Sequence, residues 1–123
     1  MTLVVVLVLC GAAGSACRYV ADVAMHRRLG RPTFYGTSVV NVAGSFLIGL
    51  FLGLAWHHHL DPLWRAALIT GFCGGFTTAS TAAVESIRLA RTGQYHQLAL
   101  QLVGTYALSI ALCFAGAWLG GVL

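Results

Sequence analysis

The most informative segment of the chain reads Thr70-Gly71-Phe72-Cys73-Gly74-Gly75-Phe76-Thr77-Thr78-Ala79-Ser80-Thr81, and it lies inside a long hydrophobic stretch. Glycines followed by hydroxyl residues disfavour a continuous helix. A helix can be interrupted at membrane depth only where the released backbone groups are buried in protein, bonded by side chains, or turned towards a cavity or an ion. Because discontinuous spans often mark ion sites, the segment predicts an ion-related break, with a merely kinked packing helix as the alternative.

The residues on either side of this segment are almost uncharged. Hydrophobic residues make up 59% of the 123 residues and charged residues only 8%, whereas soluble domains carry about a quarter. A helix needs about 20 residues to cross a bilayer. The sequence therefore predicts an all-α integral membrane bundle of four transmembrane helices, forming one domain over residues 1–123. The predicted spans cover about 2–24, 33–56, 63–87 and 98–121, and the third is broken near its middle.

Every basic side chain is an arginine, and the arginines are unevenly distributed. The first and third connections, which share one side of the membrane, contain Arg27, Arg28, Arg31, Arg88 and Arg91. The opposite side has Arg65 alone. Since cytoplasmic loops are enriched in Lys and Arg, this bias predicts both termini outside. The net charge of +4 thus reflects topology and contact with lipid headgroups, and nucleic-acid binding is not expected without a basic groove on a soluble module.

The second span carries one stripe of small or polar residues at steps of four. Its members are Thr37, Asn41, Ser45, Gly49 and Gly53. Residues at this spacing share a helix face, and small ones let helix backbones approach closely. Close packing explains Gly49 and Gly53. A buried amide without a partner costs several kcal/mol, so Asn41 needs a partner helix, water or an ion, and we expect it to be functional.

The fourth span repeats this pattern with Thr105, Ser109 and Cys113. Serine and threonine are often bonded to the carbonyl one turn earlier, so a structural role is the alternative. Two polar tracks in one small bundle favour a hydrated path.

Arg18 is a charge inside the first span, where such residues usually face the bundle interior or an aqueous vestibule. Asp22, four residues later, can pair with it. An internal salt bridge and a direct role in attracting anions therefore both remain open.

Three segments together resemble the signatures of the Fluc/CrcB fluoride channels of microbial membranes. They are Gly11-Ala12-Ala13-Gly14-Ser15-Ala16-Cys17-Arg18-Tyr19, Gly36-Thr37-Ser38-Val39-Val40-Asn41-Val42-Ala43-Gly44-Ser45-Phe46 and Gly71-Phe72-Cys73-Gly74-Gly75-Phe76-Thr77-Thr78-Ala79-Ser80-Thr81. The resemblance implies a multi-pass subunit of the cell membrane that pairs antiparallel into a dimer with two pores. Through such pores fluoride leaves the cytoplasm passively, which reduces its toxicity.

The resemblance also implies roles for individual residues. Asn41 would be the pore asparagine, and Thr105 and Ser109 would continue the polar track. Gly74 and Thr77 stand where backbone carbonyls of that family hold a structural sodium ion, which is not transported, between the two subunits. Arg18 would lie near the vestibule. Amide and hydroxyl groups can donate hydrogen bonds to a fluoride ion that has lost its water.

The chain departs from the family pattern at Ala79 and Ala82, where phenylalanine is usual. Ring edges carry partial positive charge and can face an anion, whereas methyl groups cannot do so. The strong arginine bias also favours one orientation for this chain. We therefore expect one half of a heterodimeric channel, whose unlike, homologous partner is antiparallel and supplies the phenylalanines.

Two other classes are considered. A structural or regulatory membrane subunit that conducts nothing without an unlike partner is the main alternative. A proton-coupled exporter needs a carboxylate embedded in the membrane, but Asp22 and Glu85 lie near span ends. An enzyme is not expected, because no nucleophile, base and orienting group recur in a recognisable arrangement.

Overall fold

The computed structural model describes residues 1–30 and 34–123, and within these ranges the regular structure is helical throughout. Four helical segments are long and apolar enough to cross a membrane, namely Thr2–Leu29, Tyr35–His57, Pro62–Arg91 and Tyr95–Val122. The predicted four-span, all-α membrane bundle is thus confirmed. The predicted start of the second span, at residue 33, and Arg31 lie outside the described residues.

The first two spans are single helices, α1 (Thr2–Leu29) and α2 (Tyr35–His57). The third consists of α3 (Pro62–Arg65), a π-helical segment η1 (Ala66–Cys73), α4 (Gly74–Phe76) and α5 (Ser80–Arg91). The fourth consists of α6 (Tyr95–Ala99), a second π-helical segment η2 (Leu100–Gly104) and α7 (Thr105–Val122).

Helix α1 is longer than the predicted span, which ended near residue 24. The predicted connection beginning at His26 is still helical, and the helix ends at Gly30, whose φ of 69° is left-handed and whose N–H bonds His26 O at 3.0 Å. Glycine tolerates this conformation readily. The basic side chains of the last turn are favourable at the negative end of the helix dipole. The apolar segment therefore ends where these residues begin, but the helix continues through them.

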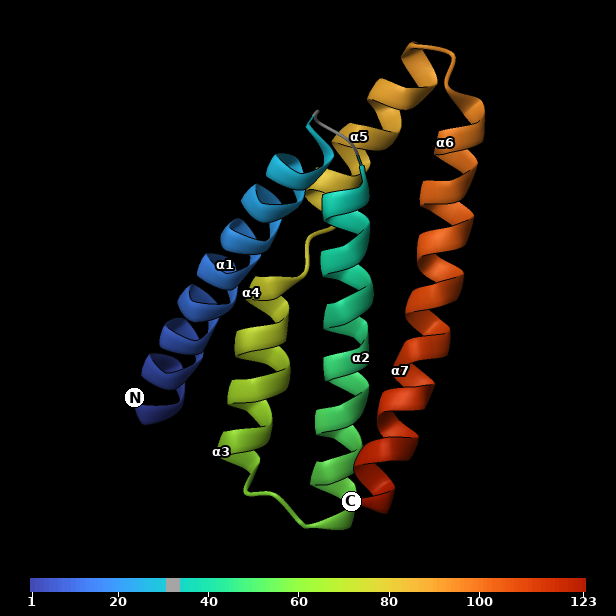
Figure 1. The fold of residues 1–123 in the computed structure, drawn as a ribbon. Helices are drawn as coiled ribbons and strands as arrows, with labels where there is room; N and C mark the ends of the chain where they lie inside the picture. The colour runs from blue at the N-terminus through green and yellow to red at the C-terminus, as the bar shows by residue number, and fades with distance from the viewer. Residues whose placement is uncertain (31–33) are drawn as a thin grey trace.

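Two helix pairs build the bundle: α2 lies beside α7, and α1 lies beside η1 and α4 (Figure 1). Glycines make the first pair close. A Cβ added to Gly49 would lie 2.0 Å from the carbonyl oxygen of Cys113, and one added to Gly116 would lie 2.3 Å from that of Phe46. Backbone therefore meets backbone along this seam, as in other membrane helix pairs.

Both termini lie at one end of the bundle, with the connection between α2 and α3, whereas α1 ends and α5 meets α6 at the opposite end (Figure 1). Arg27, Arg28, Arg88 and Arg91 belong to the last turns of α1 and α5. The described arginines of the first and third connections therefore share one side, as predicted.

Candidate functional site

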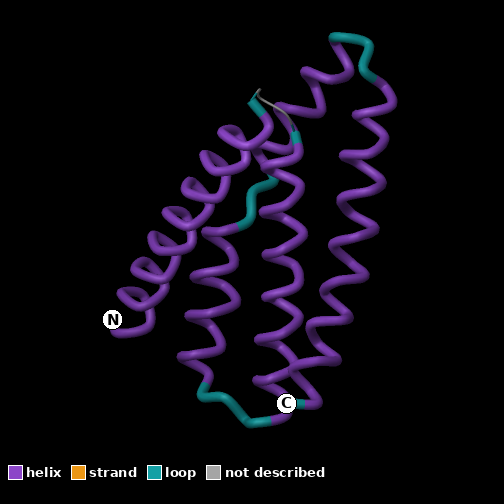
Figure 2. Tube along the Cα trace, viewed as in Figure 1, coloured by secondary structure: helices purple, strands orange, loops and turns teal. Residues whose placement is uncertain are grey.

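The third span is interrupted between Phe76, where α4 ends, and Ser80, where α5 begins (Figure 2). Thr77 has an extended backbone, with φ −80° and ψ 160°. The break is therefore confirmed, but the glycines do not unwind the helix themselves. Gly75 instead allows α4 to approach α1, because a Cβ there would lie 2.2 Å from the carbonyl oxygen of Gly11. The chain leaves the helix immediately afterwards, in the hydroxyl-rich part.

Side chains from two other spans bond the backbone around the break. From α1, Ser15 Oγ donates to Gly75 O and Arg18 Nη1 donates to Thr77 O, both at 3.3 Å. From α2, Asn41 Nδ2 donates to Thr78 O at 2.8 Å, and Thr78 N–H donates to Asn41 Oδ1 at 2.8 Å. Four backbone groups at the break, Gly75 O, Thr77 O, Thr78 O and Thr78 N–H, thus obtain the partners that a break at membrane depth requires.

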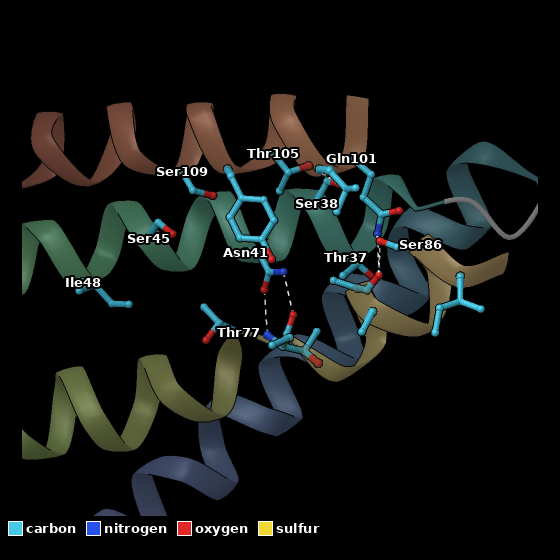
Figure 3. A pocket seen from close by; sticks show the side chains of 17 residues that line it. Thr37, Ser38, Asn41, Ser45, Ile48, Thr77, Ser86, Gln101, Thr105 and Ser109 are labelled. Atoms are coloured by element: carbon cyan, nitrogen blue, oxygen red, sulfur yellow. Dashed lines mark hydrogen bonds between the residues drawn. The ribbon is translucent and has the colours of Figure 1, made fainter. Parts of the chain in front are cut away.

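Asn41 therefore fixes the break by a two-way amide bond, drawn as dashed lines in Figure 3. A side-chain amide nitrogen carries two hydrogens. Among residues 1–30 and 34–123, Thr78 O is the one acceptor within hydrogen-bond distance of Nδ2. The second hydrogen remains available to a ligand in the groove that Asn41 lines.

Arg18 lies at the break, and the described part of the chain has no ion pair between it and Asp22. Asp22 Oδ1 lies 3.4 Å from His26 Nδ1 instead. Arg18 lines a pocket of about 160 Å³ together with Asp22, Ser15 and Thr78. The salt bridge that the sequence allowed is therefore not formed, because the guanidinium reaches across to the third span and bonds the backbone of Thr77.

Residues of both predicted polar tracks line one open groove of about 550 Å³ (Figure 3). Cys113 is not among them, and its carbonyl oxygen faces Gly49 in the seam between α2 and α7. The lining residues that carry amide or hydroxyl groups are Thr37, Ser38, Asn41, Ser45, Thr77, Thr78, Ser86, Gln101, Thr105, Tyr106 and Ser109. Thr105 Oγ1 donates to Ser38 Oγ at 2.9 Å. The structure therefore brings Asn41, Thr105 and Ser109 to one groove, and their role in a pore stays a prediction.

The stripe on α2 divides into two parts with different roles. Thr37, Asn41 and Ser45 line the groove, whereas Gly49 and Gly53 pack against the backbone of α7. Residues four apart drift around an α-helix, since four residues exceed one turn of 3.6. One sequence pattern thus provides both the polar wall and the close packing.

Ala79 and Ala82 line the same groove, beside the break. Their methyl groups give this wall an apolar surface without aromatic edges. The groove is open on the surface of the single chain.

A cation at the break would have to be held mainly by backbone oxygens, because the described residues contain no group of three or more His, Cys, Asp or Glu suited to a metal ion. Gly74 is exposed, and a Cβ added there would meet nothing within 4 Å. Thr77 O accepts one hydrogen bond from Arg18, which leaves its second lone pair. Gly74 begins α4, whereas Thr77 is extended. A structural sodium ion at these two carbonyls stays a prediction.

Sequence reasoning did not identify Gln101 or the bonding of Glu85. Gln101 Nε2 lies 3.2 Å from both Glu85 Oε2 and Ala82 O, and Thr37 Oγ1 donates to Glu85 Oε1 at 3.0 Å. A signal was present, because Gln101 precedes Thr105 by four residues and extends the polar track of the fourth span by one turn.

Comparison with known proteins gives one consistent result. A family model described as CrcB-like protein, Camphor Resistance (CrcB) matches residues 5–120. Fluoride-specific ion channel FluC 1 of Leifsonia xyli subsp. xyli is 44% identical, over 99% of this chain and 90% of the relative. Fluoride-specific ion channel FluC of Acidobacterium capsulatum is 43% identical, over 92% and 88%, and that of Coxiella burnetii (strain Dugway 5J108-111) is 39% identical, over 98% and 94%.

Proposed function

Because this chain belongs to the CrcB-like protein family, we propose that it is a multi-pass membrane subunit of a fluoride channel and lets fluoride leave the cytoplasm passively. Its relatives are named fluoride-specific ion channels. The observation that carries the proposal is the groove in which the amide of Asn41 and the hydroxyls of Thr105 and Ser109 converge. Fluoride is small and strongly hydrated, so a pore must replace its water with hydrogen-bond donors. The Asn41 amide keeps a second N–H, and the Ser109 and Ser38 hydroxyls can donate, whereas Thr105 donates its hydroxyl hydrogen to Ser38.

Growth in fluoride tests this function in cells. Cells that lack this chain and any sister subunit should stop growing at fluoride concentrations that intact cells tolerate, and expression of the pair should restore growth. Growth in equal concentrations of chloride is the control, since a general membrane defect would affect both. Equal fluoride tolerance with and without the protein would contradict the proposed function.

We further propose that the functional unit is an antiparallel pair with an unlike, homologous subunit, and that a structural sodium ion lies between the two breaks. Ala79 and Ala82 support this proposal, since two copies of this chain would present methyl groups where the family usually has aromatic rings. In the pair, this subunit supplies Asn41 and the hydroxyl track, and the partner supplies rings whose positive edges face the anion. Gly74 O and Thr77 O would hold the sodium ion together with their counterparts.

Reconstitution distinguishes the pair from a homodimer. Liposomes loaded with fluoride and containing both subunits should release it rapidly, whereas the purified chain alone should release it much more slowly. Equal release by the chain alone would contradict the unlike pair but would leave the fluoride function intact.

A second candidate is a structural or regulatory subunit that binds its partner and conducts nothing, and the two alanines are again the observation that favours it. The double variant Ala79→Phe/Ala82→Phe separates the two possibilities. Gain of fluoride release by this variant on its own supports a pore that lacks only its rings. No gain, in a variant that is still folded and inserted, favours the non-conducting subunit.

A further inference from the structure

Glu85 is a carboxylate beside the proposed anion path, yet it is not part of the groove wall. Both of its oxygens accept hydrogen bonds from residues that do line the groove. Thr37 Oγ1 donates to Oε1 at 3.0 Å, and Gln101 Nε2 donates to Oε2 at 3.2 Å. The two lining side chains thus turn their donors away from the groove and hold the carboxylate behind them.

Gln101 is the more unusual of the two donors. Its side chain is only 3% exposed, and Nε2 also lies 3.2 Å from Ala82 O on α5. The opposite amide orientation, with Oε1 and Nε2 exchanged, is unfavourable. It would place the acceptor Oε1 against two other acceptors, Glu85 Oε2 and Ala82 O. In the described chain Oε1 is itself buried and has no hydrogen-bond partner.

A half-bonded buried amide is a costly way to fill space, because an unsatisfied polar group loses the free energy of its hydration. Leucine has nearly the same size and no polar atom of its own, but it would take away the donor to Glu85 Oε2 and Ala82 O. The amide is therefore better explained by what its nitrogen does for Glu85 than by packing alone.

The other charged or titratable groups that act on Glu85 are Arg88 on its own helix and Asp22 and His26 on α1. From α2 and η2 it receives only the neutral donors Thr37 and Gln101. Neutral hydrogen bonds orient a carboxylate but do not cancel its charge. Its position relative to the groove consequently decides how strongly it repels an anion.

We propose that Gln101 is a positioning residue that holds the Glu85 carboxylate out of the anion path. This inference rests on the proposed fluoride channel function. Without the Gln101 amide, the carboxylate loses one of its two restraints and can swing into the groove, where like charges repel. Gln101 thereby acts on the ion through Glu85, and no direct contact with fluoride is required.

The test is a double-mutant cycle on fluoride release from liposomes that contain both subunits. Gln101→Leu should lower the release rate about tenfold, equivalent to about 1.4 kcal/mol. Glu85→Gln/Gln101→Leu should return the rate to that of Glu85→Gln alone, because the charge that would enter the path is gone. Gln97→Leu is the matched control, since Gln97 is exposed one turn earlier in the same span, and it should leave the rate unchanged.

A merely structural role for Gln101, such as fixing α5 through Ala82 O, predicts the opposite: the double variant stays as slow as Gln101→Leu. That result would overturn the inference. Thr37→Val provides a second route if Gln101→Leu does not fold, because it removes the bond to the other carboxylate oxygen and should be rescued by Glu85→Gln in the same way. Absence of fluoride release from the unmodified pair would instead contradict the proposed function itself.

Discussion

Asn41 connects the break to the groove through a single side chain. Its amide bonds both backbone groups of Thr78, and its second nitrogen hydrogen remains available on the groove side. The cost of an unbonded amide in hydrocarbon predicted that Asn41 has a partner, but not which backbone group it would be. The sequence shows directly where a polar residue lies inside a span. It does not show the hydrogen-bond partner of that residue, because the partner depends on how the helices pack.

Asn41→Asp tests whether the amide is needed as a donor. The change keeps an acceptor for Thr78 N–H but replaces the donor to Thr78 O and adds a negative charge beside the path. We expect fluoride release from liposomes with both subunits to fall about tenfold or more, equivalent to at least about 1.4 kcal/mol. Cys17→Ala, at an exposed position of α1, is the control, and undiminished release by Asn41→Asp would contradict the role of this amide as a donor.

Arg18 shows the limit of spacing arguments at the same scale. Its separation from Asp22 suits an ion pair on one helix, yet the long side chain reaches Thr77 O on another span. Sequence spacing describes neighbours within a helix, and a competing partner from another helix can displace them.

Substitution of Arg18 can determine whether its charge attracts anions. Arg18→Lys keeps the charge, and Arg18→Gln keeps a donor for Thr77 O without it. If the charge concentrates fluoride near the break, release should fall several-fold in Arg18→Gln, most strongly at low ionic strength, and little in Arg18→Lys. Equal losses in both variants would assign Arg18 to support of the break alone.

At the scale of elements, the interruption of the third span was predicted correctly from the sequence. The contribution of its glycines to that interruption was overestimated. Gly75 is helical and makes room for α1, and the extended backbone comes at Thr77. Glycine is compatible with both a break and a close helix contact, so composition alone cannot separate them. The hydroxyl residues that follow, and the side chains that bond their backbone, locate the break.

The glycine seam between α2 and α7 leads to a stability prediction with an internal control. Gly49→Ala would place a methyl carbon 2.0 Å from Cys113 O, so the helices must separate, and we expect a loss of about 1–3 kcal/mol in the free energy of unfolding. Gly104→Ala meets nothing within 4 Å and should be neutral or stabilising by up to about 1 kcal/mol. Unfolding of both variants in mixed detergent micelles measures the difference, and equal stabilities would contradict the close seam.

At the scale of the whole molecule, the four spans and the shared side of the arginines followed from hydropathy and charge, because the bilayer restricts spanning segments so strongly. The antiparallel partner and the sodium ion stay predictions, since both depend on a second surface. Ala79 and Ala82 stand where aromatic rings are usual, so the partner surface is expected to supply aromatic rings to the groove at these positions.

The arginine bias predicts a single orientation with both termini outside the cytoplasm. A reporter that is active only outside should work when fused to the C-terminus, and one that fluoresces only in the cytoplasm should remain dark. Arg→Gln changes at Arg27, Arg28, Arg88 and Arg91 should weaken this preference. Strong signals from both reporters in the unmodified chain would show dual insertion and favour a homodimer.

Anion release from liposomes that contain this chain and its partner tests the central claim most directly, with fluoride and chloride followed in the same vesicles by ion-selective electrodes. The account predicts fast release of fluoride and negligible release of chloride. Retention of fluoride, or release of chloride as fast as fluoride, would contradict it.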